Sequence, residues 1–146
     1  MRKALIVVGV IAASLATVLG AGAATDAGTT KLVANLRGSN EAPPAAASNR
    51  GRTEIRLTAS TGKVCWETTI TKIDGKPNAS HIHKGGKGVS GNVIVPLGAG
   101  YKREGCTTVP KATVKAILKN PGRYYVNVHN AKHPAGAMRG QLARGT

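Results

Sequence analysis

The sequence predicts an all-β protein: an antiparallel β-sandwich or barrel of immunoglobulin-like or Greek-key type, with one short helix. Short segments in which apolar and polar residues alternate run through most of the chain, as in strands that bury one face. Glycine, proline and asparagine residues separate these segments about every ten residues, a spacing typical of sandwiches and barrels. A single segment has helical spacing, and neither an internal repeat nor a second domain is visible.

The expected strands are short and bounded by turns. In the first of them Leu32, Ala34 and Leu36 share one face, because side chains two apart on a strand point the same way. A proline pair among small and polar residues predicts a loop over residues 38–52. Strands are expected over residues 31–36, 53–59, 64–73, 79–84, 92–97, 106–109, 123–130 and 137–143.

The helical segment covers residues 110–120. Pro110 stands at its start, where a helix tolerates a residue without an N–H. Val114, Ile117 and Leu118 follow at helical spacing, and a proline–glycine pair comes directly after the segment. We therefore expect one short helix that packs against the sheet through these three side chains.

The N-terminal residues have the features of a signal peptide. Arg2 and Lys3 precede an uncharged apolar run over residues 4–19, and a small-residue cleavage site ends at Ala23 or Ala24. The run is shorter than the roughly 20 residues of a membrane-spanning helix, and no later segment resembles one. We divide the chain into a signal peptide (1–24), a flexible leader (25–30) and one domain (31–146), and we expect a secreted or cell-envelope protein.

The chain is strongly basic. Its 21 lysine and arginine residues and 6 acidic residues give a net charge of +15, and removal of Arg2 and Lys3 with the signal peptide leaves +13. Such a charge favours anionic cell-surface polymers or an extracellular protein as partners, although a basic surface without any dedicated partner is the alternative. Specific binding of nucleic acid is not favoured, because one tryptophan, three tyrosines and no phenylalanine offer little for base stacking.

Cys65 and Cys106 are the only cysteines. In an exported chain an even pair is most simply a disulfide, which would close a loop of about 40 residues and contribute on the order of 3–4 kcal/mol. The alternative is that both are thiolate ligands beside the histidines.

The histidines are the main candidates for chemistry. His81 and His83 point to one face of their strand, and the same parity places Asn127 and His129 together on a later strand. If the two strands are neighbours, three imidazoles meet, with His133 as a possible fourth, and imidazole binds copper and zinc well. The structural alternative is that these histidines donate ordinary hydrogen bonds that pin loops.

Two charged residues complete the set of candidates. Arg139 could bind a carboxylate or phosphate ligand, but an internal pair with Glu41 is the favoured interpretation. Glu41 is also a candidate carboxylate that would accept a hydrogen bond from a metal-binding histidine and so orient its ring. No nucleophile elbow, phosphate-binding loop or HExxH motif is present, so no catalytic residue is assigned and enzymatic activity is not favoured.

Several blocks of the sequence, in order, resemble one family, the CHRD domain, which was first named from chordin and is widespread in secreted bacterial proteins. The resemblance covers Leu32 to Leu142. The matching blocks are Leu32-x-Ala34-x-Leu36-x-Gly38-x-x-Glu41-x-Pro43-Pro44, His81-Ile82-His83-x-Gly85, Gly91-x-Val93, Pro121-x-x-Tyr124-Tyr125-Val126-Asn127-Val128-His129 and Pro134-x-Gly136-Ala137-Met138-Arg139-Gly140-Gln141-Leu142.

The resemblance implies an extracellular, immunoglobulin-like β-sandwich or barrel, and Cys65 and Cys106 look like the cysteines of small bacterial members with one disulfide. In chordin the repeats belong to a protein that binds growth factors, but the family supplies no catalytic residues. We therefore expect a non-enzymatic binding module of unknown ligand. The alternative is a copper- or zinc-binding protein, and a third possibility, by geometric analogy only, is a metalloenzyme similar to copper/zinc superoxide dismutase.

Overall fold

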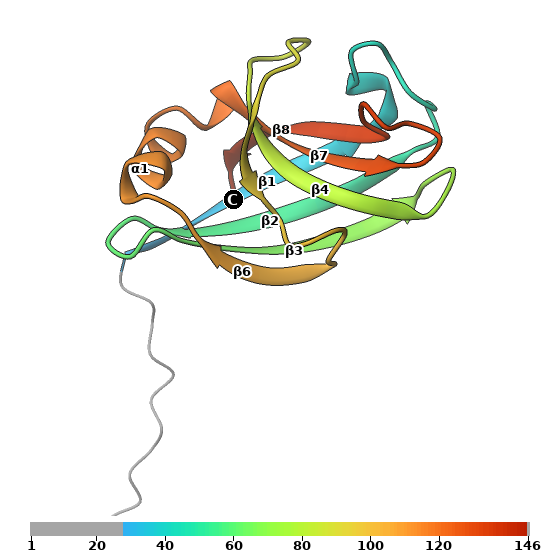
Figure 1. Cartoon of the computed structure of the whole chain (residues 1–146). Helices are drawn as coiled ribbons and strands as arrows, with labels where there is room; N and C mark the ends of the chain where they lie inside the picture. Colours follow the sequence, from blue (N-terminus) through green and yellow to red (C-terminus); the bar gives the residue numbers. More distant parts are fainter. Residues whose placement is uncertain (1–27, 146) are drawn as a thin grey trace, which may run out of the picture.

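The computed structural model describes residues 28–145, which form one eight-stranded antiparallel sheet curled into a half-barrel (Figure 1). Its strands lie in the order β5-β4-β7-β8-β1-β2-β3-β6. They are β1 (Thr29–Arg37), β2 (Arg50–Thr58), β3 (Lys63–Lys72), β4 (Pro77–Lys84), β5 (Val93–Pro96), β6 (Glu104–Thr108), β7 (Tyr124–Asn130) and β8 (Met138–Arg144). The helix α1 (Lys111–Lys119) and two 3-10 turns, η1 (Gly38–Asn40) and η2 (Pro121–Arg123), complete the fold. The predicted all-β antiparallel class with one short helix is confirmed.

Five strands begin one to three residues earlier than the sequence pattern indicates, and two of them, β1 and β2, show why. β1 starts at Thr29, inside the expected leader, because its first residues pair with the end of β2 and the Thr29 hydroxyl lies 2.8 Å from that of Thr58. β2 starts at Arg50 rather than residue 53, because Arg50 pairs with Arg37 of β1 on one side and with β3 on the other. The expected signal peptide and the start of the leader lie outside the described residues.

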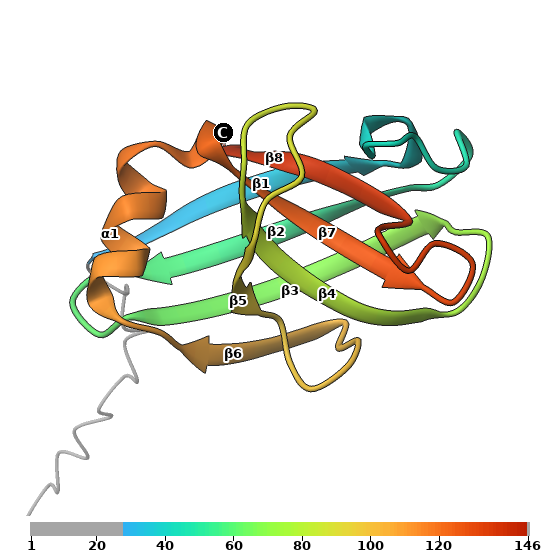
Figure 2. The same ribbon diagram turned by 45° about the horizontal axis from the view of Figure 1, so that its top comes forward.

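The inner face of the half-barrel forms the hydrophobic core. Alternation places Leu32, Ala34 and Leu36 of β1 on this face, as predicted, and all three are buried. Helix α1 covers one end of the half-barrel and buries Val114 and Ile117 against it (Figure 2). No helix within residues 28–145 is long and apolar enough to cross a membrane.

The disulfide joins neighbouring strands rather than two stacked sheets. Cys65 of β3 and Cys106 of β6 are directly opposite in the antiparallel register, and their sulfurs are bonded. Trp66 points the other way, into the core, where it is almost fully buried and its indole N–H donates to the Lys102 carbonyl over 3.0 Å. The cysteine pair is therefore a disulfide, and the alternative of two thiolate ligands is wrong.

The outer face of β4, β7 and β8 is polar. Directly opposite residues of antiparallel strands point to the same side of a sheet, so the pairing register shows which residues of neighbouring strands share a face. The outer face bears His81 and His83 on β4, Tyr125, Asn127 and His129 on β7, and Arg139 and Gln141 on β8. Two loops, residues 38–49 and 85–92, lie against this face and are joined where the Ser90 hydroxyl donates to the Ala42 carbonyl over 3.3 Å.

Candidate metal centre

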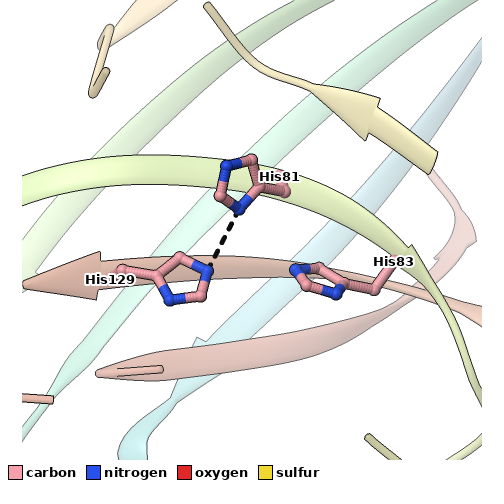
Figure 3. A group of neighbouring side chains, drawn as sticks. All are labelled: His81, His83 and His129. Atoms are coloured by element: carbon pink, nitrogen blue, oxygen red, sulfur yellow. Dashed lines mark hydrogen bonds between the residues drawn. The ribbon is translucent and has the colours of Figure 1, made fainter. Parts of the chain in front are cut away.

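Three histidines meet where β4 and β7 pair on the outer face. His81 and His83 are two apart on β4, and His129 of β7 is opposite Ala79, one diagonal step from His81. One ring nitrogen from each histidine lies within 4.8 Å of the other two, and Figure 3 shows these nitrogens turned toward a common space. The closest pair is His81 Nδ1 and His129 Nε2, which are 3.1 Å apart.

Backbone carbonyls set the tautomers of two of these rings. His83 Nδ1 is 2.8 Å from the carbonyl oxygen of Gly91, and His129 Nδ1 is 3.0 Å from that of Pro134. Because a carbonyl only accepts hydrogen bonds, each Nδ1 must carry the proton, which leaves a lone pair on each Nε2. This is the arrangement usual for metal-bound histidine, in which the second ring nitrogen donates to a carbonyl or carboxylate.

His83 Nε2 is left without a hydrogen-bond donor. It is buried and has no partner among residues 28–145. A buried acceptor left in this way costs the fold roughly 1–3 kcal/mol, unless something outside the protein chain binds it. A cation placed among the three rings would engage this lone pair together with the lone pairs of the other two histidines.

Burial favours the neutral form of two of the three rings, His81 and His83. Burial, together with the neighbouring His129 and His83, lowers the pKa of His81 to about 4. Burial also lowers the pKa of His83, against the opposing effect of its hydrogen bond to Gly91. Neutral imidazole is the form that binds a metal, so burial keeps His81 and His83 in the charge state that a metal site needs.

The cluster is supported from one side by Tyr125. The Tyr125 ring stacks on His83 with centroids 4.9 Å apart and planes 9° from parallel, and its hydroxyl accepts the Gly91 N–H over 3.2 Å. Gly91 is thus held through both its N–H and its carbonyl. A Cβ at position 91 would overlap the Lys84 carbonyl, so only glycine allows this loop to lie so close to β4.

His133, the possible fourth ligand, lies elsewhere. Its Nε2 is 2.9 Å from Asp74 Oδ2, and its backbone N–H donates to Asn130 Oδ1 over 2.8 Å. Asp74 also accepts from Asn49 Nδ2 over 2.6 Å, and these bonds, that from Asn49 first, lower the pKa of Asp74 to about 2. His133 therefore links two turns, and the structure does not bring it to the other three histidines.

Glu41 and Arg139 form the internal pair favoured from the sequence. Glu41 Oε2 is 3.3 Å from Arg139 Nε and 3.4 Å from Asn127 Nδ2, and all three side chains are buried. Burial raises the pKa of Glu41 to about 7, against the charges of Arg139 and His133 and the Asn127 hydrogen bond. Glu41 forms a hydrogen bond with none of the three clustered histidines, so it does not orient any of these rings.

The groups that orient the rings were missed at the level of sequence. Gly91 and Pro134 act through backbone carbonyls, which every residue possesses, so no residue type signals them. The Asp74–His133 pair joins residues 59 apart in the chain and likewise leaves no local pattern. Tyr125 could be found, because strand parity alone places it on the face of the histidines.

Comparisons with known proteins agree with the fold. The family model described as the CHRD domain matches residues 32–142, which is most of the chain. Neither a search of curated proteins nor a search of solved structures found a match.

Proposed function

This chain belongs to the CHRD domain family, and we propose that it is an exported binding module of that family which holds one zinc or copper ion between His81, His83 and His129. CHRD domains are extracellular, and the Cys65–Cys106 disulfide fits an oxidising compartment. The observation that carries the proposal is the pair of fixed tautomers: two backbone carbonyls hold Nδ1–H of His83 and His129, so that both Nε2 lone pairs face the space beside His81 Nδ1, which donates to His129 Nε2 until a metal ion replaces that hydrogen bond.

The donor set supports zinc and copper over other cations. All three donors are imidazole nitrogens, whereas calcium and magnesium prefer several oxygen ligands. Zinc–imidazole bonds of about 2.0–2.1 Å in a tetrahedral site separate the ligand nitrogens by roughly 3.4 Å. The closest pair here, at 3.1 Å, is near that value, and the most distant, at up to 4.8 Å, would have to close by roughly 1–1.5 Å on binding.

Three protein ligands leave one position of a tetrahedral site open. In zinc proteins that position takes water or a ligand from outside, whereas purely structural sites use four protein ligands. An open position supports a module that presents its ion to a partner. We keep the binding role and assign no turnover to the site.

The test is a metal titration of the mature chain, residues 25–146, with its disulfide formed. Zinc and copper are titrated in competition with a chromophoric chelator, into the wild type, His83→Ala and His133→Ala. We expect one equivalent to bind at micromolar affinity or tighter in the wild type, which corresponds to about 8 kcal/mol or more. His83→Ala should lose this binding, whereas His133→Ala, which also removes one histidine, should keep it. Equal binding by the wild type and His83→Ala would show that the cluster is structural.

A further inference from the structure

Arginines on three neighbouring strands stand in one row on the outer face, beside the metal centre. The register pairs Arg139 of β8 with Arg37 of β1, and Arg37 with Arg50 of β2. Side chains directly opposite on antiparallel strands have their Cβ atoms about 4.5–5.5 Å apart, and like charges so placed repel each other. Arg139 is paired with Glu41, but the charges of Arg37 and Arg50 face each other and reduce the stability of the sheet at this point.

The two exposed members of the row lack acidic neighbours. Neither Arg37 nor Arg50 forms an ion pair with a carboxylate within residues 28–145. Arg50 donates only to the carbonyl of Ser48, over 3.3 Å. The repulsion between them is thus not relieved by an acid of the described chain.

Acidic groups on the same sheet face lie farther along the strands and are already paired. Glu54 is within 4.0 Å of Lys31 and 3.6 Å of Arg52, and Glu67 is 3.6 Å from Arg103. At the buried end of the row, Glu41 pairs with Arg139. The exposed surface around Arg37 and Arg50 therefore keeps an excess of positive charge.

Two hollows flank the row. One, of about 350 Å³, lies between β1 and β2 and is lined by Arg37, Arg50 and Arg52. The other, of about 370 Å³, lies over β8 and is lined by Arg139 and Lys87 together with η1. Glu41 also lines this hollow, and Arg139 itself is buried, so Lys87 is its exposed cation. Each hollow falls in the size range of sites for small organic groups.

We propose that this row binds a linear acidic polysaccharide that runs across the strands from β2 toward β8. Arg50 and Arg37 are exposed on adjacent strands about 4.7–4.9 Å apart, a spacing close to the length of one sugar unit in a polymer with a carboxylate on each sugar. Arginine is suited to such a ligand because its planar guanidinium binds a carboxylate through two parallel hydrogen bonds. The two hollows give adjacent places for sugar rings.

A single-stranded nucleic acid fits this surface less well. It would need exposed aromatic side chains for its bases. Trp66, Tyr124 and Tyr125 are buried, Tyr101 is half-buried, and none of the four lies among the residues that line the two hollows. Hydroxyl and carboxylate groups of a sugar chain, by contrast, match a surface of arginine, lysine and amide groups.

The experiment measures binding of the mature protein to polygalacturonate at low salt, in the presence of a metal chelator. The chelator separates this proposal from the proposed function, because the row should bind polymer with or without a metal, and His83→Ala should bind it as the wild type does. We compare Arg37→Gln/Arg50→Gln with Lys111→Gln/Lys115→Gln, which removes the same charge from exposed positions on α1. All four positions are exposed, so both variants are expected to fold, and their thermal midpoints are measured as a check.

We expect the row variant to lose roughly tenfold in affinity for each arginine, the fold-change of one charge-assisted hydrogen bond, and the helix variant to lose far less. Binding should weaken as salt rises, since exposed charges are screened. The proposal is overturned if both variants lose affinity equally, because net charge alone would then explain binding. It is also overturned if the wild type binds oligodeoxythymidine or polyphosphate more tightly than polygalacturonate.

Discussion

Zinc should raise the free energy of unfolding of the mature chain, because its three proposed ligands come together only in the folded state. The ligands come from β4 and β7, and His81 and His129 are 48 residues apart, so only the folded chain brings them together. Binding to the folded state alone contributes RT ln(1 + [L]/Kd), or about 2.7 kcal/mol when free zinc is one hundred times the Kd. A domain of roughly 120 residues unfolds with an entropy of about 0.25 kcal/mol per degree, so the midpoint of thermal unfolding should rise by about 11 °C.

The assay is calorimetry or scanning fluorimetry of metal-free protein, with the disulfide intact and free zinc buffered at known levels. His83→Ala should shift by less than about 2 °C at the same zinc concentration, because two remaining imidazoles bind far more weakly. His133→Ala should shift as much as the wild type, since its side chain lies at Asp74 and not in the cluster. An equal shift for His83→Ala and the wild type would refute the reasoning, as would a midpoint that falls when zinc is added.

Three further predictions follow from the same structure. In the metal-free protein an NMR titration should place the pKa of His81 near 4. Between pH 6.5 and 4 the unfolded chain then binds a proton at His81 that the folded chain does not, so the free energy of unfolding should fall as pH drops through this range. A measured pKa near the ordinary 6.5 would contradict this. Asp74→Asn should lower the free energy of unfolding in urea at pH 7. The pKa of Asp74 lies near 2 in the folded protein, below its ordinary 3.8, so the stability difference between this variant and the wild type should disappear as pH falls from about 4 to 2. Ile117→Ala should lower the free energy of unfolding in urea by about 2–5 kcal/mol, because the Ile117 side chain of α1 is fully buried against the sheet. Lys115→Ala, at an exposed position of the same helix, should change it by less than about 0.5 kcal/mol. Similar losses for the two variants would show that α1 does not pack as described.

Strand parity was enough to assign faces. The inward side of β1, the pairing of His81 with His83 on one side, and the opposite directions of Cys65 and Trp66 all follow from a period of two, and the structure has each of them. Each of these predictions is local and needs no knowledge of which strands are neighbours.

Long-range pairing could not be derived from the residues. That β4 lies beside β7, and not beside β3, depends on the whole sheet order, and the three-histidine cluster exists only because of that order. The early start of β2 was hidden for a different reason. Arg50-Gly51-Arg52 has no apolar residue to mark a buried face, and Gly51 leaves no side chain at all, yet the backbone pairs on both sides.

Because the disulfide and the histidines belong to different parts of one sheet, loss of the disulfide should leave the three-histidine cluster intact. Cys65–Cys106 closes the β3–β6 edge, whereas the histidines lie on β4 and β7, at the other end of the strand order. Reduction would release an edge strand and leave the β4–β7 pairing in place. The reduced protein would then be a less stable fold that keeps the three histidines together, so the proposed metal affinity should not depend on the disulfide.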